Sequence, residues 1–290
     1  MDTPLPVTVV NHSTLLKMSE YIYVLTMKTA IFCLTRGYPH IQYYTKLLER
    51  NKQIAKNFNS DEVDMILFNE GNIPFEHQKY IQVNCDIPLK FVTVPFKFPR
   101  DIEIPYETYK TFTDGSCYPG YHLMCEFNAC FVWDYLKGYD IGFRVDEDCI
   151  FISDNWKERL QEFIKSNDVF RTPGYHKGQR DSHEMTNETL PHFLVSVFGT
   201  DTMYNCTPAT NVYMTKLAFW DKPEVREFLK KIETSQGCLK YRWGDAPLIG
   251  CILNLYAPGQ FLIIKNIEYF HQSHNNIIKI GETEEKSWCG

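Results

Sequence analysis

Two aspartates separated by one residue stand near the middle of the chain, directly after an apolar run. They are Asp146 and Asp148, in the stretch Arg144-Val-Asp-Glu-Asp148. In an extended segment, residues two apart point to the same side, so both carboxylates would face one ion. Carboxylate oxygens suit Mg²⁺ or Mn²⁺, and a metal with open positions can bind a diphosphate. An acidic surface turn is the alternative, but a position after a buried strand favours a ligand site.

Two further groups of residues could complete such a site. Imidazole suits Mn²⁺, so His271 would make a third ligand, unless it and His274 are surface residues. In Arg242-Trp-Gly-Asp-Ala-Pro247 a flat indole, Trp243, lies beside a flexible glycine and the carboxylate of Asp245. That combination is typical of a sugar platform, although Asp245 could instead only cap the helix that follows. The chain has no Gly-rich phosphate loop and no local signature of a nucleophile elbow.

Alternating strand-like and helix-like segments must position these residues. Apolar runs predict strands over 29–35, 64–68, 90–94, 141–145, 212–215 and 261–265. Helical spacing predicts helices over 41–58, 121–137, 188–198, 221–235 and 245–255, with Asp221 as the cap of the fourth. The proline-containing segment 95–120 between a strand and a helix is predicted to be a long loop that covers the site.

The composition indicates an ordinary folded domain. The chain has 290 residues, of which 44% are hydrophobic and 23% charged, and this supports one α/β domain with a mostly parallel sheet flanked by helices. The formal charge of -6 argues against nucleic acid as a partner. Ten cysteines form no C-x-x-C pair, which disfavours structural zinc. The apolar stretch Tyr21 to Leu34 is interrupted by polar residues, so no membrane span is predicted.

Several blocks together resemble one family, the fungal Golgi α-1,2-mannosyltransferases, which have the nucleotide-sugar transferase fold called GT-A. The matching blocks are CLTR (33–36), YHLMCEFNACF (121–131), GFRVDEDCIF (142–151), TNVYMTKLAFW (210–220), YRWGDAPL (241–248) and IEYFH (267–271). The resemblance implies a GT-A domain over 29–275, with a nucleotide-binding half (29–150) and an acceptor half (151–275). An N-terminal extension (1–28) and a C-terminal tail (276–290) would flank it.

The resemblance also implies a reaction and a set of site residues. It implies transfer of mannose from GDP-mannose to a glycan or other hydroxyl acceptor, with retention and with Mn²⁺ (or Mg²⁺) on the diphosphate. The family's metal ligands would correspond to Asp146, Asp148 and His271. Thr35 and Arg36 would contact the nucleotide, Tyr121 and Arg144 the diphosphate and donor sugar, and Asp245 the sugar and acceptor. We expect a protein that is soluble as given, cytoplasmic if the chain is complete, and Golgi-lumenal if an anchor has been removed.

The chain departs from the family pattern at two positions. Glu126 stands where the family has arginine, and Tyr213 stands at the position of the family's proposed nucleophilic glutamate. Tyr213 is therefore either a catalytic residue or a core tyrosine. Two alternatives to the mannosyltransferase follow: a transferase that uses a UDP-hexose, and a non-catalytic sugar-binding or nucleotide-binding protein on the same fold.

Overall fold

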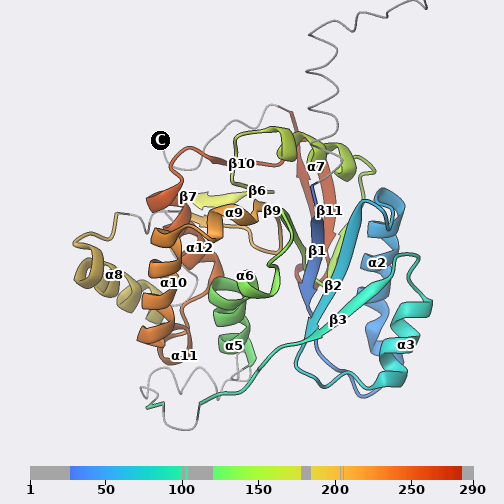
Figure 1. The fold of residues 1–290 in the computed structure, drawn as a ribbon, viewed down its shortest axis with the longest axis horizontal. Coiled ribbons are helices and arrows are strands. Elements are labelled where there is room, and N and C mark those ends of the chain that lie inside the picture. The colour runs from blue at the N-terminus through green and yellow to red at the C-terminus, as the bar shows by residue number, and fades with distance from the viewer. Residues whose placement is uncertain are drawn as a thin grey trace, which may run out of the picture.

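The computed structural model describes residues 27–99, 102–103, 120–177, 184–202, 204 and 206–282. These residues form a seven-stranded sheet with the strand order β10-β6-β9-β4-β1-β2-β3 (Figure 1). Its strands are β1 (Thr29–Leu34), β2 (Val63–Asn69), β3 (Leu89–Thr93), β4 (Ile141–Val145), β6 (Phe170–Thr172), β9 (Val212–Lys216) and β10 (Phe261–Ile263). Strand β9 is antiparallel to β4 and β6, and the other neighbours pair in parallel, which confirms the predicted mostly parallel sheet.

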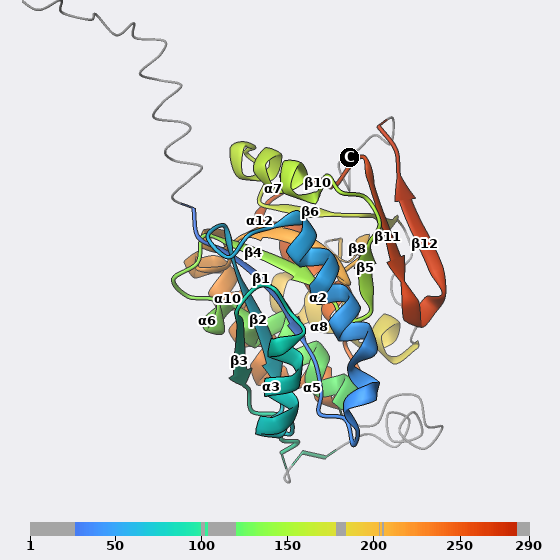
Figure 2. The ribbon, with the colours of Figure 1, turned by 90° about the vertical axis from the view of Figure 1, so that its right-hand side faces the viewer.

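Both faces of the sheet are covered, which explains why its central strands are apolar throughout. Successive residues of β1 point to opposite faces, so Ile31 enters one core and Ala30 and Phe32 enter the other. Helices α2 (Thr45–Asn57), α3 (Phe75–Val83) and α7 (Trp156–Lys165) cover the first face. The second face carries α5 (Gly120–Glu126), η2 (Phe127–Phe131), α6 (Val132–Tyr135), α8 (Glu184–Phe198), α9 (Leu217–Trp220), α10 (Pro223–Ser235), α11 (Gly237–Tyr241) and α12 (Asp245–Tyr256). Figures 1 and 2 show the two layers.

The helix predicted over 121–137 is confirmed, with one irregularity. Its middle turn, η2, is a π-helix between α5 and α6. A π turn is wider than an α turn by one residue and is common at functional sites. In α6, which follows this turn, the indole of Trp133 donates to the carbonyl of Ala129 at 2.8 Å and stacks on Trp220 with ring centroids 3.7 Å apart. This packing fixes the helix against the second face of the sheet.

A second, antiparallel sheet stands beside the first (Figure 2). It has the order β12-β11-β5 and consists of β5 (Cys149–Phe151), β11 (Ile267–His271) and β12 (Asn276–Ile280). Its register places His271 opposite Cys149. The predicted tail, 276–290, therefore includes a strand that pairs along the whole of β11. The remaining short elements are η1 (Ile41–Tyr44), η3 (Gln272–His274), and the paired strands β7 (Tyr175–Lys177) and β8 (Cys206–Pro208).

Two local expectations differ from the structure or fall outside it. Asp221 does not cap the helix that follows, because α10 begins after Lys222 and the Asp221 carboxylate accepts a hydrogen bond from Arg226 instead. The loop predicted over 95–120 lies mostly outside the described residues. Among the helices that are described, none is long and apolar enough to cross a bilayer.

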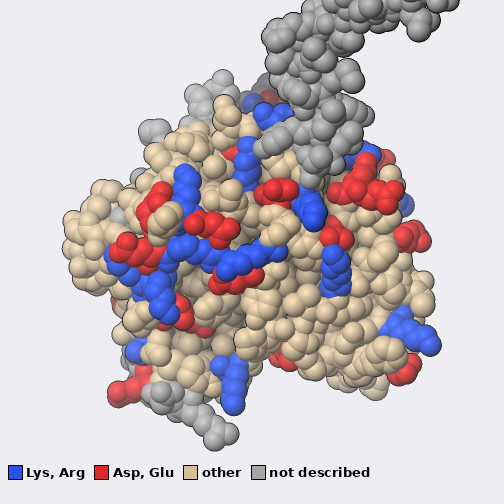
Figure 3. Space-filling model, viewed as in Figure 1, with Lys and Arg blue, Asp and Glu red and all other residues tan. Residues whose placement is uncertain are grey.

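Charged side chains of both signs mix on the face seen in Figure 3. On α10 exposed residues form ion pairs one turn apart, such as Lys231 Nζ to Glu227 Oε1 at 2.7 Å and Lys230 Nζ to Glu233 Oε2 at 2.9 Å. Ion pairs between exposed side chains contribute little to stability, because water and salt screen them. This side of α10 is therefore a solvated helix face.

Candidate active site

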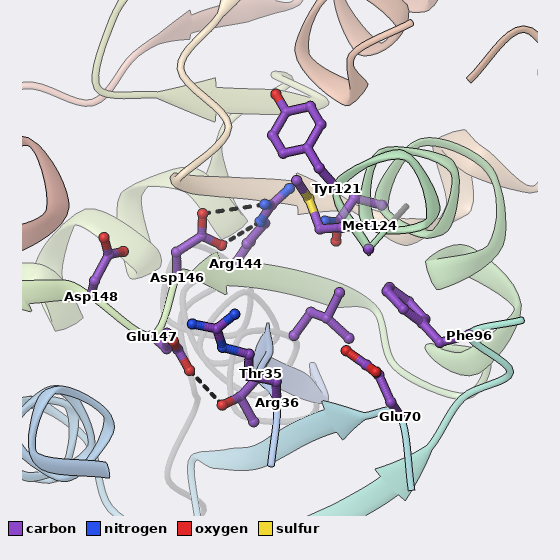
Figure 4. A pocket seen from close by; sticks show the side chains of 13 residues that line it. Thr35, Arg36, Glu70, Phe96, Tyr121, Met124, Arg144, Asp146, Glu147 and Asp148 are labelled. Atoms are coloured by element: carbon purple, nitrogen blue, oxygen red, sulfur yellow. Dashed lines mark hydrogen bonds and ion pairs between the residues drawn. The ribbon is translucent and has the colours of Figure 1, made fainter. Parts of the chain in front are cut away.

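A cleft of about 520 Å³ opens at the carboxyl ends of β1, β2 and β4, beside α5 (Figure 4). The ends of parallel strands are where α/β folds bind ligands. The lining includes six residues that the sequence or the resemblance singled out: Thr35, Arg36, Tyr121, Arg144, Asp146 and Asp148. Glu70, Phe96, Met124, Asn128 and Glu147 complete most of the wall. Six of the predicted site residues therefore line one cleft, and the structure adds residues to it.

Arg144 lies at the floor of the cleft and bonds to two carboxylates, one after β4 and one at the start of α12. It is 5% exposed; its Nε and Nη2 donate to Asp146 at 2.7 and 3.2 Å, and its Nη1 donates to Asp245 at 2.7 Å. Burial opposes its charge, but the carboxylates of Asp146 and Asp245 raise the pKa of Arg144 above its usual value. Of the five N–H groups of a guanidinium, these bonds use one on each nitrogen, so a ligand in the cleft can accept from the others.

Asp245 does not cap its helix. Gly244 is the N-cap residue of α12, no side chain caps that end, and Asp245 is the first helical residue. Its carboxylate is buried and bonded to Arg144, so α12 delivers a negative charge to the floor of the cleft. The interpretation of Asp245 as only a helix cap is therefore wrong.

The segment after β4 turns sharply instead of continuing as an extended chain. The Cys149 N–H donates to the Asp146 carbonyl at 3.0 Å, which closes a turn over the acidic residues. The carboxylates of Asp146 and Asp148 consequently diverge: Asp146 faces Arg144, and Asp148 faces His271 (Figure 4 shows the first pair). Burial raises the pKa of Asp146 to about 6, even though Arg144 lowers it. The expectation that both carboxylates share one side through strand geometry is wrong.

Asp148, Cys149 and His271 form a group of possible metal ligands. Their ligand atoms lie within 4.8 Å of one another, and His271 Nε2 is 3.5 Å from Asp148 Oδ2. Pairing of β5 with β11 brings them together from distant parts of the chain. Burial lowers the pKa of His271, although Asp148 acts in the opposite direction, so the imidazole is neutral and can bind a metal. Burial raises the pKa of the Cys149 thiol, which keeps it protonated and makes it the poorest ligand of the three.

Asn211 is a residue of this site that sequence reasoning missed. Its Nδ2 lies 3.3 Å from His271 Nδ1, 3.1 Å from the Tyr269 hydroxyl and 3.5 Å from Cys149 Sγ. Its backbone carbonyl accepts from the Asp146 N–H at 2.8 Å. Asn211 therefore fixes the orientation of the imidazole and the position of the acidic turn together. It stands directly before β9, inside a block that the resemblance had matched.

Glu147 is the second residue that was missed. Its two carboxylate oxygens accept hydrogen bonds from the Thr35 and Tyr38 hydroxyls, each at 2.5 Å. Burial, and then Glu147 itself, raise the pKa of Tyr38 to about 12, so this hydroxyl keeps its proton and donates. The three side chains tie the end of β1 to the turn after β4. Arg36, the next residue after Thr35, lies over the Tyr38 ring at 5.2 Å.

Tyr213 lies beneath the cleft and outside its lining. It is fully buried on β9 opposite Arg144, whose guanidinium is 5.9 Å from the ring centroid, and its ring stacks on Phe170 at 4.8 Å. Its hydroxyl makes no hydrogen bond within the described part of the chain. Burial raises the pKa of Tyr213 well above its usual value. These properties are those of a core tyrosine and not of an activated nucleophile.

Trp243 was predicted as a sugar platform, and the structure contradicts this. It is 1% exposed, does not line the cleft, and donates from Nε1 to Thr189 at 2.8 Å. A Cβ on Gly237 would stand 2.1 Å from the indole, so the ring packs where this glycine leaves space. Tyr121, which does line the cleft, carries the Arg242 guanidinium 4.5 Å from its ring.

Glu126, the first departure from the family pattern, does not line the cleft. Burial, reinforced by the charge of Glu233, raises the pKa of Glu126 to about 7. A carboxyl with a raised pKa destabilises the fold progressively as pH rises from its unfolded value, near 4.5, to its folded value, and the cost is constant above that. Glu126 is therefore a half-buried acid of the helical layer.

We expect Glu126→Gln to stabilise the protein more at high pH than at low pH. Between pH 5 and pH 8 the difference in free energy of unfolding between the variant and the wild type should grow by about 2–3 kcal/mol in favour of glutamine. Urea unfolding at both pH values measures it, and Glu227→Gln on the exposed face of α10 is the control. A difference that stays constant with pH would show that Glu126 is ionised at little cost.

The arrangement of the sheet, with a cleft at its strand ends, is that of the GT-A fold, as the resemblance predicted. Two solved structures share it. Core-mannan synthase A (CmsA/Ktr4) from Aspergillus fumigatus, in a Mn/GDP form, superposes with a TM-score of 0.64 at 17% identity, over 90% of this chain and 80% of that one. The mannosyltransferase Ktr4p from S. cerevisiae, in complex with GDP, gives 0.68 at 14% identity, over 99% and 87%.

Curated relatives narrow the resemblance to fungal mannosyltransferases, which confirms the expectation from the sequence. The probable mannosyltransferase KTR3 of Saccharomyces cerevisiae is 27% identical over 208 residues, which are 64% of this chain and 47% of the relative. Glycolipid 2-alpha-mannosyltransferase 1 of Candida albicans is 25% identical over 175 residues, 54% of this chain and 40% of the relative. The matches thus span less than half the length of either relative. No protein-family profile matches the chain.

Proposed function

We propose that this protein is a metal-dependent glycosyltransferase that moves mannose from GDP-mannose to a hydroxyl group of a glycan. The observation that carries the proposal is that Asp148 lines the same cleft as Arg144 and has His271, which is outside the lining, 3.5 Å away. The similarity to mannosyltransferases, including structures in Mn/GDP and GDP forms, supports the choice of donor.

The charge of the cleft supports a divalent cation as a cofactor. Two basic residues line it, Arg36 and Arg144, against four acidic ones, Glu70, Asp146, Glu147 and Asp148. A diphosphate would be repelled by this excess of negative charge unless a cation bound with it. Carboxylate and imidazole are donors that Mn²⁺ accepts, so Asp148 and His271 fit the ion. A bound Mn²⁺ would neutralise charge on the leaving diphosphate.

Asp146 has a different place in this proposal from the one its spacing predicted. Both of its oxygens already accept from Arg144, so its first task is to hold that guanidinium in the cleft. A carboxylate has further lone pairs, and Asp146 remains a predicted third ligand. Arg144, with its unused N–H groups, would donate to the diphosphate oxygens, and Asp245 would hold Arg144 from below and face the donor sugar.

We propose retention of configuration without a covalent intermediate. A covalent route needs a nucleophile near the anomeric carbon, and Tyr213 is buried with a raised pKa. The acceptor hydroxyl would therefore attack from the side of the departing diphosphate, whose oxygen takes the proton. NMR of the product decides: a β-mannoside would overturn retention, and a sugar trapped on Tyr213 would overturn the absence of an intermediate.

Tyr213→Phe should keep most of the transferase activity. Removing a buried hydroxyl that lacks a partner should leave stability unchanged or raise it by about 1 kcal/mol. Turnover of GDP-mannose and urea unfolding measure the two effects. Loss of turnover in a stably folded Phe variant would return Tyr213 to the catalytic residues.

A comparison of donors tests the proposed function as a whole. We expect Mn²⁺-dependent thermal stabilisation by GDP, with about 2.7 kcal/mol at a hundred times Kd, and release of GDP with glycan mannosylation from GDP-mannose. Stabilisation and transfer with UDP and a UDP-hexose instead would favour the UDP-dependent transferase. Nucleotide binding without transfer or hydrolysis of any donor would favour the non-catalytic protein.

A further inference from the structure

Glu147 lines the cleft and ties the end of β1 to the acidic turn, but it has no ligand assigned to it in the proposed site. It is the only residue of the acidic turn 146–148 that pairs with neither Arg144 nor His271. Among the described residues, the ligand group at the turn consists of Asp148, Cys149 and His271, without Glu147. A carboxylate beside a diphosphate needs hydrogen-bond donors, because an unpaired negative charge there would weaken binding of the anion.

The contacts that Glu147 makes indicate which hydrogen-bond donors its carboxylate binds. Both of its oxygens accept from hydroxyl groups, one of Thr35 and one of Tyr38, at 2.5 Å. A carboxylate has about four acceptor positions, so each oxygen keeps one for a ligand. The carboxylate is thus held by two fixed hydroxyls with its remaining lone pairs available to the cleft. A ligand with two neighbouring hydroxyls matches such a group.

The position of Glu147 in the cleft indicates which group of the nucleotide sugar would lie beside it. It is the direct neighbour of Asp148, which would hold the metal on the diphosphate, and it is bonded to Thr35 at the end of β1. Asp245, which would face the donor sugar, lies on the other side of Arg144. In a nucleoside diphosphate sugar, the group that follows the diphosphate away from the sugar is the ribose, and the base is one group further.

From these contacts we infer that Glu147 binds the 2′- and 3′-hydroxyls of the donor ribose and makes the site selective for ribonucleotides. This inference rests on the proposed function, because it needs a nucleoside diphosphate in the cleft. Thr35 and Tyr38 act as positioning residues that hold the carboxylate toward the sugar ring of the nucleotide. Two charge-assisted hydrogen bonds to a ligand correspond to an affinity contribution of about 10- to 100-fold.

Calorimetry with two nucleotides tests the inference. We expect wild-type protein with Mn²⁺ to bind GDP about 10- to 100-fold more tightly than 2′,3′-dideoxy-GDP. Glu147→Gln should lower this ratio to about threefold or less, since a neutral amide makes weaker hydrogen bonds and offers only one acceptor atom. Glu158→Gln, a carboxylate variant on the exposed side of α7 and outside the cleft, should leave the ratio at its wild-type value.

Each other outcome has a definite meaning. Equal binding of the two nucleotides by the wild type overturns the inference while the proposed function stands, and this measurement does not depend on how well the variant folds. A Glu147→Gln ratio that equals the wild-type ratio also overturns it. Inosine diphosphate, which lacks the guanine amino group, is the last nucleotide to compare. If Glu147→Gln no longer distinguishes GDP from inosine diphosphate but keeps the wild-type ratio between GDP and 2′,3′-dideoxy-GDP, Glu147 contacts the base and the inference is overturned. If the wild type binds no nucleotide with Mn²⁺, the proposed function and this inference fail together.

Discussion

Replacing Arg144 with methionine should lower the free energy of unfolding by about 3–5 kcal/mol, because the buried carboxylate of Asp245 and the half-buried one of Asp146 then lose their positive partner. Asp245 is 6% exposed, and both oxygens of Asp146 are bonded to the same guanidinium. Donor binding and transfer should be lost as well, since Arg144 is the cation at the floor of the cleft. Urea unfolding at neutral pH and a GDP-mannose transfer assay measure the two effects.

A double variant distinguishes two causes of the lost stability, the unpaired carboxylate charges and the lost packing of the Arg144 side chain. Arg144→Met combined with Asp245→Asn removes one of the two orphaned charges, so the double variant should be more stable than Arg144→Met alone. Arg171→Met is the matched control: its Nη2 pairs with Asp168 at 2.6 Å, partly exposed and away from the cleft. It should cost less stability and leave nucleotide binding intact. An Arg144→Met protein as stable as the wild type would show that Asp146 and Asp245 tolerate each other's charge.

The second large effect concerns metal-dependent binding of the nucleotide. Asp148→Ala should weaken Mn²⁺-dependent binding of GDP by at least about 100-fold, because residues that only orient a ligand already cost 10- to 100-fold. His271→Ala should act in the same direction, since its Nε2 faces the same carboxylate at 3.5 Å. Asp146→Ala should also lose binding, through release of Arg144 and loss of the predicted third ligand.

Calorimetry of GDP with and without Mn²⁺ checks this expectation. Asp154→Ala, an exposed aspartate a few residues beyond the acidic turn, is the control and should bind as the wild type does. Unchanged Mn²⁺ dependence in both Asp148→Ala and His271→Ala would remove this metal site. Urea unfolding of each variant establishes that the losses do not come from unfolding.

Local patterns in the sequence were sufficient to predict most of the sheet. Strand β4 has the predicted bounds, 141–145, because an unbroken apolar run between polar residues leaves little choice of structure. The position of Thr35, Arg144 and the acidic turn at one edge of the sheet also follows, because parallel strands end on the same side. These are consequences of residues close together in the chain.

The errors arose where partners are distant in sequence. Trp243 has the composition of a sugar platform, and only the neighbouring Gly237 and the Thr189 hydroxyl on α8 place it in the core. Asp245 resembles a cap because it stands at the start of a helix, and its pairing with Arg144 depends on how α12 meets β4. Asn211 gave no local signal, since its partners come from the acidic turn and β11. Side-chain pairing of this kind is decided by packing in three dimensions.

The pairing of β5 with β11 has a consequence for the order of events during synthesis. His271 meets Cys149 and Asp148 only when two segments more than a hundred residues apart have joined, and closing so large a loop is slow compared with forming a helix. A nascent chain that has emerged only as far as β9 can already assemble β1, β2 and β4, together with Arg144 and the acidic turn. It cannot hold Asp148 against an imidazole, so the ability to bind metal should appear as a late step, after β11 has left the ribosome and docked.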